Sequence, residues 1–406
     1  MPVPREDPSG NPALGERRTV EAASVDDGAR RARALSCMRL DAGLLCFLAL
    51  VLAVFVAVHH YLEPRFDFGV FYYAAHMVLD GSRHALYNFD AQHAFQIRFN
   101  RPPDTLFRNP PFALLPILCI AKLPLLVAFS IWTAVSFVLL YVSLKTLESE
   151  TGVCYGNWPI LLSLAYVPVM ASFLHGQFSL LVLASVVLAY AQWKKGQLFL
   201  GGLILSIATL KFQLVIGLVA VLLLKGKWRE LAGFASGCAV LLAISVFITG
   251  IPALLAYPSF VLHSDTPISE LPHMANLQGF LSLIGLNHVW ILILLSVLTV
   301  LWAARAWTDV DRGLLAAILA GMLVSFHLTP QDLSISLVPI YLSVKTGVLP
   351  RSRFPLFVFV VMIVLMIWVG TYMPIAILAA PIAAALWWVG RSTLAREQEP
   401  QESTVA

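Results

Sequence analysis

A few ionisable side chains stand alone in a chain that is otherwise dominated by apolar residues. Asp67 lies among the aromatic residues of the segment Arg65–Ala75, and Lys211 stands within a long apolar stretch from Leu198 to Leu224. An ionisable group at membrane depth is costly and usually marks a functional site. A partly desolvated carboxylate is suited to act as a general base, and an ammonium group attracts an anion such as a phosphate.

Each of these residues also has a structural alternative. Asp67 is typical of a helix N-cap, because its carboxylate accepts hydrogen bonds from free backbone N–H groups. Lys211 has snorkelling as its alternative, in which a long side chain carries its charge to the membrane surface. Snorkelling fits this sequence poorly unless Lys211 lies at the outer end of two short helices, where its ammonium group would also reach a lipid phosphate.

Two further polar clusters fall at junctions between apolar runs. Arg108 precedes the sequence Asn-Pro-Pro-Phe, whose prolines favour an extended boundary turn, and its planar guanidinium is suited to bidentate contact with a phosphate. His175 and Gln177 flank a single glycine between two apolar runs. That pattern is typical of a tight helical hairpin, or equally of side chains that bind a sugar hydroxyl.

A late junction carries an imidazole and a carboxylate together. His327 and Asp332 lie on one short loop, on the same expected side as Asp67 and Lys211. A lone histidine at a helix end is usually structural, but this combination favours a site. The spacing is not that of the zinc motif HExxH, so no zinc-hydrolase site is predicted. Asn276, in another polar loop, is a further candidate for substrate contact, with an ordinary loop as its alternative.

The composition indicates that the bilayer is the solvent of this protein. Of 406 residues, 59% are hydrophobic and only 12% are charged, whereas soluble proteins carry about 25% charged residues. The net charge of +4 is spread over short basic clusters between apolar runs, which favours orientation signals over a nucleic-acid surface. The five cysteines form no CxxC pair, and neither a disulfide framework nor a zinc site is predicted.

One membrane domain is expected between two polar tails. Residues 1–40 are predicted to be a disordered cytoplasmic tail, residues 41–391 a transmembrane domain, and residues 392–406 a second cytoplasmic tail. The apolar run 42–62 has about 20 residues, enough to cross ~30 Å of hydrocarbon. Arginines just before this run place the N-terminus in the cytoplasm.

Two outer loops follow from this orientation. The loop 63–111 is rich in aromatic residues, which favour the headgroup level, so one or two helices are expected along the membrane surface. The segment 111–123 is too short to cross and is expected to be re-entrant or interfacial. A second outer loop is expected over residues 251–287.

The remaining apolar runs predict further spans, several of them shorter than the ~17 residues of a straight crossing. Short helices are tolerated at membrane depth only against protein or a wet cavity. The spans are expected at 125–146, 157–174, 177–193, 197–211, 212–224, 231–250, 288–306, 312–328, 333–347, 354–371 and 373–390.

This layout separates the basic clusters from the candidate site residues. The clusters fall on the cytoplasmic side if the segment 111–123 does not cross, and the polar candidates gather at the outer leaflet. A wet cavity with a carboxylate, an imidazole and cations suits a phosphate-bearing lipid donor, because cations hold the leaving phosphate while the carboxylate removes a proton from the attacking hydroxyl. The clusters are Lys194-Lys195, Lys225/Lys227/Arg229, Arg305/Arg312, Lys345/Arg351/Arg353 and Arg391.

These residues together resemble the pattern of glycosyltransferase family 87, whose members are membrane enzymes of the GT-C fold and include polyprenol-phosphate-mannose-dependent mannosyltransferases. Each matching motif is short, and their order and spacing carry the resemblance. The matching pieces are Asp67–Ala75, Leu79-Asp80-Gly81 with Leu86-Tyr87, Asn109–Phe112, Gly176-Gln177, Leu210-Lys211, Asn276, and His327 with Asp332-Leu333.

The resemblance implies an all-α integral membrane bundle of the GT-C type, with about 12 transmembrane helices and interfacial helices in the first outer loop. It implies an inverting transfer of a hexose, with mannose expected, from a polyprenyl-phosphate donor to a lipid or glycan acceptor. The reaction would take place at the outer face of the plasma membrane without a cofactor or metal. Asp67 would be the general base, and His327 would serve the donor phosphate or the site geometry. Members often carry tyrosine before the late aspartate, where this chain has Gln331.

A lipid-linked sugar flippase or another transporter is the alternative. Transporters often show repeated halves and polar sites near the midplane. This sequence shows no internal repeat, and its polar candidates gather near one face, which favours the enzyme. A membrane acyltransferase is expected to centre on a different pattern of His and Asp.

Overall fold

The computed structural model describes residues 67–98, 106–153, 158–263, 268–286, 288–350 and 374–398. Within these residues every regular element is a helix, which confirms the all-α class. The expected spans 42–62 and 354–371 and the N-terminal tail 1–40 lie outside the described residues, so the expected number of about 12 spans stays a prediction. By length and composition alone, four helical stretches could cross a membrane: Leu125–Thr151, Leu198–Leu224, Trp228–His263 and Ile375–Thr393.

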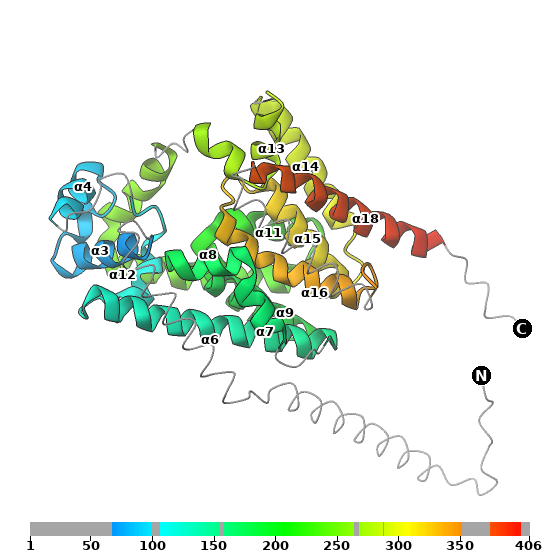
Figure 1. Ribbon diagram of the computed structural model, residues 1–406, viewed down its shortest axis with the longest axis horizontal. Coiled ribbons are helices and arrows are strands. Elements are labelled where there is room, and N and C mark those ends of the chain that lie inside the picture. The colour runs from blue at the N-terminus through cyan, green and yellow to red at the C-terminus, as the bar shows by residue number, and fades with distance from the viewer. Residues whose placement is uncertain are drawn as a thin grey trace, which may run out of the picture.

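The helices pack into one bundle, with α3 and α4 at one end beside the second half of α12 (Figure 1). The elements are α3 (Asp67–Leu79), η1 (Arg83–Ala85), α4 (Phe89–Ile97), η2 (Pro111–Leu114), α5 (Leu115–Leu118), α6 (Leu125–Thr151), α7 (Trp158–Ala165), α8 (Val167–His175), α9 (Ser179–Lys194), α10 (Leu198–Leu205), η3 (Ser206–Lys211), α11 (Phe212–Leu224), α12 (Trp228–His263), η4 (Ile268–His273), α13 (Leu277–Leu283), α14 (Val289–Arg305), α15 (Val310–Val324), η5 (Pro330–Ser336), α16 (Leu337–Lys345), η7 (Ile375–Leu378) and α18 (Ala379–Gln398).

The apolar stretch Leu198–Leu224 reverses direction at Lys211. α10 runs back along α9, so that the Lys211 Nζ atom lies 3.0 Å from the hydroxyl of Ser179 at the start of α9. The backbone of Lys211 leaves the helical region, with φ −129° and ψ 67°. The predicted break between two short helices at this residue is therefore confirmed.

α11 then returns along α15 to the far end of the bundle. The ring of Phe212 lies 5.3 Å from that of Phe326, just beyond the last residue of α15. After α11, Lys227 Nζ lies 5.9 Å from the ring of Trp307, which precedes α15. Lys194, just before α10, pairs with Asp311 at the start of α15, so both ends of the stretch Leu198–Leu224 lie near the start of α15. A single straight helix of this length would instead end about 40 Å from its start.

The contacts define two ends of the bundle, which we call the site face and the basic face. The site face holds Asp67, Gln177, Lys211 and Asp332. The basic face holds the ends of α9, α11 and α16 and the start of α15. There Lys194 pairs with Asp311 at 3.0 Å, and Arg312 donates to Thr346 O at 3.3 Å and to Thr393 Oγ1 at 3.1 Å.

The basic clusters share the basic face, as the sequence predicted. Arg391 lies within α18, two residues before Thr393, which contacts Arg312 on this face. The other basic residues lie at or near helix ends that meet there, namely Lys194-Lys195, Lys225/Lys227/Arg229, Arg305/Arg312 and Lys345. Arg351 and Arg353 lie outside the described residues. The packing thus separates the basic clusters from the candidate site residues, as the number of spans before each cluster had indicated.

The aromatic residues of the first outer loop that the structure describes pack inside the protein, and their expected placement at the headgroup level stays a prediction. Phe68, Phe71, Tyr72 and Tyr73 are at most 8% exposed. The Phe71 ring lies 4.4 Å from that of Phe178, because α6 and the turn between α8 and α9 cover α3. The rings therefore anchor α3, and with it Asp67, to the bundle.

The short segment η2–α5 begins and ends on the site face, as expected for a segment that does not cross. Asn109 Nδ2 donates to the carbonyl of Leu210 at 3.4 Å before the segment. After it, Tyr72 Oη donates to the carbonyl of Leu123 at 2.7 Å.

Several helix boundaries differ from the predicted ones. α15 ends at Val324 rather than near residue 328, which leaves residues 325–329 as a loop outside the helices. α12 continues past the predicted end at 250, but Gly250 interrupts it with φ 81° and ψ 165°. Its second half packs against η1 and η2, and its Phe260 ring lies against the Phe89 ring of α4. α18 continues into the expected C-terminal tail as far as Gln398.

Candidate active site

The carboxylate of Asp67 is held by the junction between α8 and α9. Gln177 Nε2 donates to Asp67 Oδ2 at 2.5 Å, and His175 Nδ1 lies 3.5 Å from the same oxygen. The Asp67 side chain is 30% exposed. Among the described residues, both side-chain contacts of Asp67 use Oδ2.

A glycine turn sets this geometry. Gly176 ends α8 with φ +63°, where a left-handed backbone favours glycine. A Cβ at this position would meet Phe68, directly next to Asp67, and the carbonyl of Gly176 accepts a hydrogen bond from Trp132 at 2.9 Å. The tight-hairpin interpretation of His175-Gly176-Gln177 is therefore present, and the hairpin also carries both partners of Asp67.

Lys211 forms a buried ion pair with Asp332. The ammonium group donates to Asp332 Oδ1 and, at 3.0 Å, to the hydroxyl of Ser179, which in turn donates to Asp332 Oδ1 at 3.0 Å. The two charged side chains are 7% and 1% exposed. A charge buried to this degree is stable only when paired and hydrogen-bonded.

The other oxygen of Asp332 begins η5. Oδ2 accepts from the backbone N–H of Thr329 at 3.1 Å and from its hydroxyl at 2.8 Å, which forms a capping box. The pKa of Asp332 is held below its usual value: burial raises it, but the adjacent Lys211 and these hydrogen bonds lower it more. Asp332 is thus an ionised anchor for the loop that precedes it.

That loop carries His327, which is half-buried between α15 and η5. Burial lowers the pKa of the imidazole; Asp332 opposes this effect, whereas Lys211 and Arg108 add to it. The histidine is therefore neutral near pH 7 and is able to donate or accept a hydrogen bond. The negative charge of Glu270 raises the pKa of His327, as that of Asp332 does.

Asn276 fixes the same loop from the second outer segment. It is fully buried; its Oδ1 accepts from the N–H of Gly279 at 2.7 Å and its Nδ2 donates to the carbonyl of Ser325 at 2.8 Å. The Ser325 hydroxyl donates to the carbonyl of His327 at 2.9 Å. The described contacts give Asn276 a positioning role, and its predicted contact with substrate stays a prediction.

Arg108 is exposed on the site face, near enough to His327 to affect its titration. The neighbouring Asn109 ties the loop to the reversal at Lys211 through the carbonyl of Leu210. Arg108 and His327 therefore border the same region with their polar groups available, whereas Lys211 is enclosed by Asp332 and Ser179.

The segment 175–179 joins these groups into one site. Its histidine and glutamine contact Asp67, and its Ser179 contacts both Lys211 and Asp332. Asp67, Lys211 and Asp332 thus lie on one face and are joined through this segment. Among the described residues, no three His, Cys, Asp or Glu side chains cluster in a way that would hold a metal ion.

Two members of this network were not singled out from the sequence. Ser179 carried no signal, because a serine after an apolar turn is common. Thr329 did carry one, since Thr followed three residues later by an acidic side chain is typical of a capping box.

The comparison with known families agrees with this geometry. The sequence model described as glycosyltransferase family 87 matches residues 107–330, more than half of the chain. The match includes Arg108, His175, Gln177, Lys211 and His327, but it begins after Asp67 and ends just before Asp332. No curated protein and no solved structure matches the chain. The chain, with its apolar helices and its polar face, therefore belongs to glycosyltransferase family 87 and is a membrane glycosyltransferase.

Proposed function

We propose that this enzyme transfers a hexose, with mannose as the expected sugar, from a polyprenyl-phosphate donor to a glycolipid acceptor at the outer face of the plasma membrane. The observation that supports the proposal best is the carboxylate of Asp67. It is held through one oxygen by Gln177 and His175, on the face opposite the basic clusters.

In the proposed reaction, Asp67, Arg108 and His327 act directly on the substrates. Asp67 Oδ1 accepts the proton of the acceptor hydroxyl while that hydroxyl oxygen bonds to the anomeric carbon of the donor. The bond between the anomeric carbon and the phosphate oxygen breaks, and the polyprenyl phosphate leaves with the electron pair. Arg108 and His327 stabilise the phosphate through a bidentate guanidinium and an imidazole hydrogen bond. Attack opposite the leaving group inverts the anomeric configuration.

Lys211 has a different place in this scheme from the one predicted. Because Lys211 pairs with Asp332, it helps to hold the loop that carries His327. Two of its three ammonium hydrogens are donated to Ser179 and Asp332, which leaves one for another acceptor. Direct contact of Lys211 with the donor phosphate is therefore the weaker proposal, and Arg108 takes that role.

The sidedness is supported by the charges. Positive residues near helix ends favour the cytoplasmic side, and they share the basic face, so the site face would open outward. A membrane-impermeant maleimide applied to intact cells tests this, with the native cysteines replaced. Ser82→Cys on the site face should be labelled, and Lys195→Cys on the basic face should not. Labelling in the reverse pattern would overturn the outward site.

The base role is tested by Asp67→Asn, with the exposed residue Asp90→Asn as the matched control. Purified variants are given a labelled polyprenyl-phosphate mannose together with lipid extract as the acceptor source. Asp67→Asn should lower transfer by about 100-fold or more, because general-base catalysis contributes ~10²–10⁴-fold and the amide cannot accept the proton. Control and variant should fold alike. Wild-type turnover by Asp67→Asn would exclude the base role.

The transporter alternative is disfavoured by the family assignment. A flippase would move labelled lipid between leaflets without changing it, so the appearance of a new glycolipid and the loss of that product in Asp67→Asn separate the two functions.

A further inference from the structure

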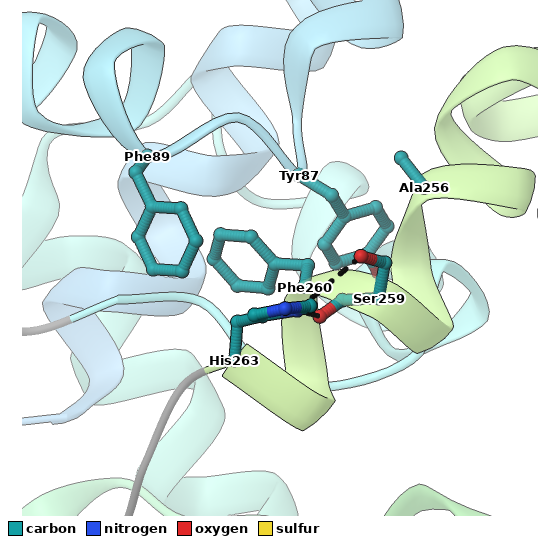
Figure 2. A pocket seen from close by; sticks show the side chains of 6 residues that line it. All are labelled: Tyr87, Phe89, Ala256, Ser259, Phe260 and His263. Carbon is teal, nitrogen blue, oxygen red and sulfur yellow. Dashed lines mark hydrogen bonds between the residues drawn. The ribbon is translucent and has the colours of Figure 1, made fainter.

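A pocket near the site face is lined by none of the residues that contact Asp67. It has a volume of about 410 Å³ and lies between the start of α4 and the second half of α12. Figure 2 shows its lining: three aromatic rings, of Tyr87, Phe89 and Phe260, with the polar side chains of Ser259 and His263 at its edge. A volume of this size falls within the ~300–1,000 Å³ of small-molecule sites.

The rings of the aromatic wall contact one another. The rings of Phe89 and Phe260 are stacked at 4.4 Å, and the Tyr87 ring lies 5.5 Å from that of Phe260. Tyr87 and Phe260 are at most 6% exposed, whereas Phe89 is half-buried. Phe89 is therefore the ring that a ligand can cover. The electron-rich face of an aromatic ring attracts the C–H groups on the less polar face of a pyranose.

The edge supplies hydrogen-bonding groups. His263 Nδ1 lies 2.7 Å from the carbonyl of Ser259, which only accepts, so in the neutral ring the proton sits on Nδ1. Nε2 is then an acceptor for a hydroxyl. Ser259 and His263 are both exposed, so these groups meet water as well as ligand. An apolar ring beside exposed donors and acceptors suits a sugar better than a hydrocarbon chain.

The pocket also adjoins an exposed apolar stripe on α12. The second half of α12 packs one side against α4, and its other side carries Ile251, Leu255 and Leu262, which are 59%, 74% and 78% exposed. An exposed apolar stripe of this kind on a membrane protein suits contact with lipid. A sugar in the adjacent pocket would therefore sit at headgroup level, where the glycan of a glycolipid lies.

Hydrogen bonds connect the pocket to the active site. Tyr87 Oη donates to the carbonyl of Asn109 at 2.6 Å, and Asn109 Nδ2 donates to the carbonyl of Leu210, next to Lys211. The pocket thus adjoins the loop that carries Arg108. Because the pocket is open to water, it suits a sugar that is held but not cleaved.

We propose that this pocket binds a pyranose unit of the acceptor glycolipid, stacked on Phe89, and so holds the acceptor while its hydroxyl reaches Asp67. The inference rests on the proposed function for its role in catalysis. The binding itself does not depend on turnover.

The test uses the full-length enzyme in lipid nanodiscs, since maltoside detergents carry sugars. Saturation-transfer NMR with methyl α-mannopyranoside, methyl α-glucopyranoside and methyl α-galactopyranoside as probes, and no donor, measures binding. At least one probe should bind the wild type. Phe89→Leu keeps the apolar bulk but removes the π face, and it should weaken binding tenfold or more. Phe89→Tyr keeps the face and should bind like the wild type.

The outcomes separate the pocket from the transferase proposal. Asp67→Asn should retain pyranoside binding while transfer is lost, so a failure of the catalytic scheme would leave the pocket result intact. Binding by Phe89→Leu equal to that of the wild type would overturn the inference. So would the absence of binding of every pyranoside by the wild type at about 50 mM, a concentration at which a free energy of only about −1.8 kcal/mol would be detected. Displacement of a bound pyranoside by decane alone would assign the pocket to a hydrocarbon chain and would also overturn it.

Discussion

The contact between Gln177 and Asp67 makes the sharpest prediction for the active site. If Gln177 orients the base, Gln177→Glu should lower kcat, even though glutamate has almost the same shape as glutamine. Glutamate offers no N–H donor when ionised, and it places a second negative charge beside Asp67. A role in packing alone would be preserved by this substitution.

The size of the effect follows from the hydrogen bond that is lost. Hydrogen bonds to charged groups contribute about 1.5–3 kcal/mol. The Asp67 side chain is 30% exposed, so water competes for it and the lower value applies. A loss of about 1.4 kcal/mol corresponds to tenfold in rate. Gln177→Ala should therefore lower kcat by about tenfold, and Gln177→Glu by at least as much because repulsion is added.

The assay measures kcat and KM for donor and acceptor separately, beside a thermal melt for each variant. The orienting role requires that KM change less than about twofold, since the ground-state contacts with substrate are not altered. Gln177→Asn retains an amide donor on a shorter side chain and should recover part of the rate. A raised KM with unchanged kcat in Gln177→Glu would refute the reasoning and would restore the prediction that Gln177 binds a sugar hydroxyl.

Two further perturbations test the supports of the site. Lys211→Met leaves Asp332 charged and unpaired in a buried position, so it should lower the free energy of unfolding by about 3–5 kcal/mol, seen as a lower unfolding temperature. The double variant Lys211→Met with Asp332→Asn should recover much of the lost stability. The control Lys122→Met, at an exposed position, should leave the unfolding temperature unchanged. A raised donor KM without loss of stability in Lys211→Met would instead support the predicted phosphate contact. Gly176→Ala forces a side chain into a left-handed backbone at a cost of about 1–2 kcal/mol and drives its methyl group against Phe68, so both the melting temperature and kcat should fall. Wild-type kcat in Gly176→Ala would show that the turn does not set the position of Gln177.

The sequence was most informative about candidate site residues where burying an ionisable group costs free energy. Asp67 and Lys211 stood out because an ionisable group among apolar residues needs a partner or a function. The break at Lys211 was predictable for a related reason, since a charge in the middle of a straight span would have no water near it. The separation of basic clusters from candidate residues also followed from the positive-inside rule and the number of spans.

The partners of those residues could not be predicted. Gln177 and Asp67 are 110 residues apart, and Lys211 and Asp332 are 121 residues apart. Spacing along the chain shows that a residue lies at a helix end, but not which other helix ends lie beside it. The aromatic residues after Asp67 illustrate the same limit: the amphipathic character of the rings suited the membrane surface, and the bundle instead covered them with α6 and the turn after α8.

The membrane environment, the helical class and the family were properties of the sequence by itself, because they depend on composition, on apolar runs and on short motifs in order. Only the tertiary structure decided that Lys211 pairs with Asp332, that the hairpin at Gly176 holds the carboxylate of Asp67, and that α12 bends at Gly250 to line an aromatic pocket with α4. These contacts depend on how helices pack side by side, and the packing depends on complementary shapes distributed over the whole chain.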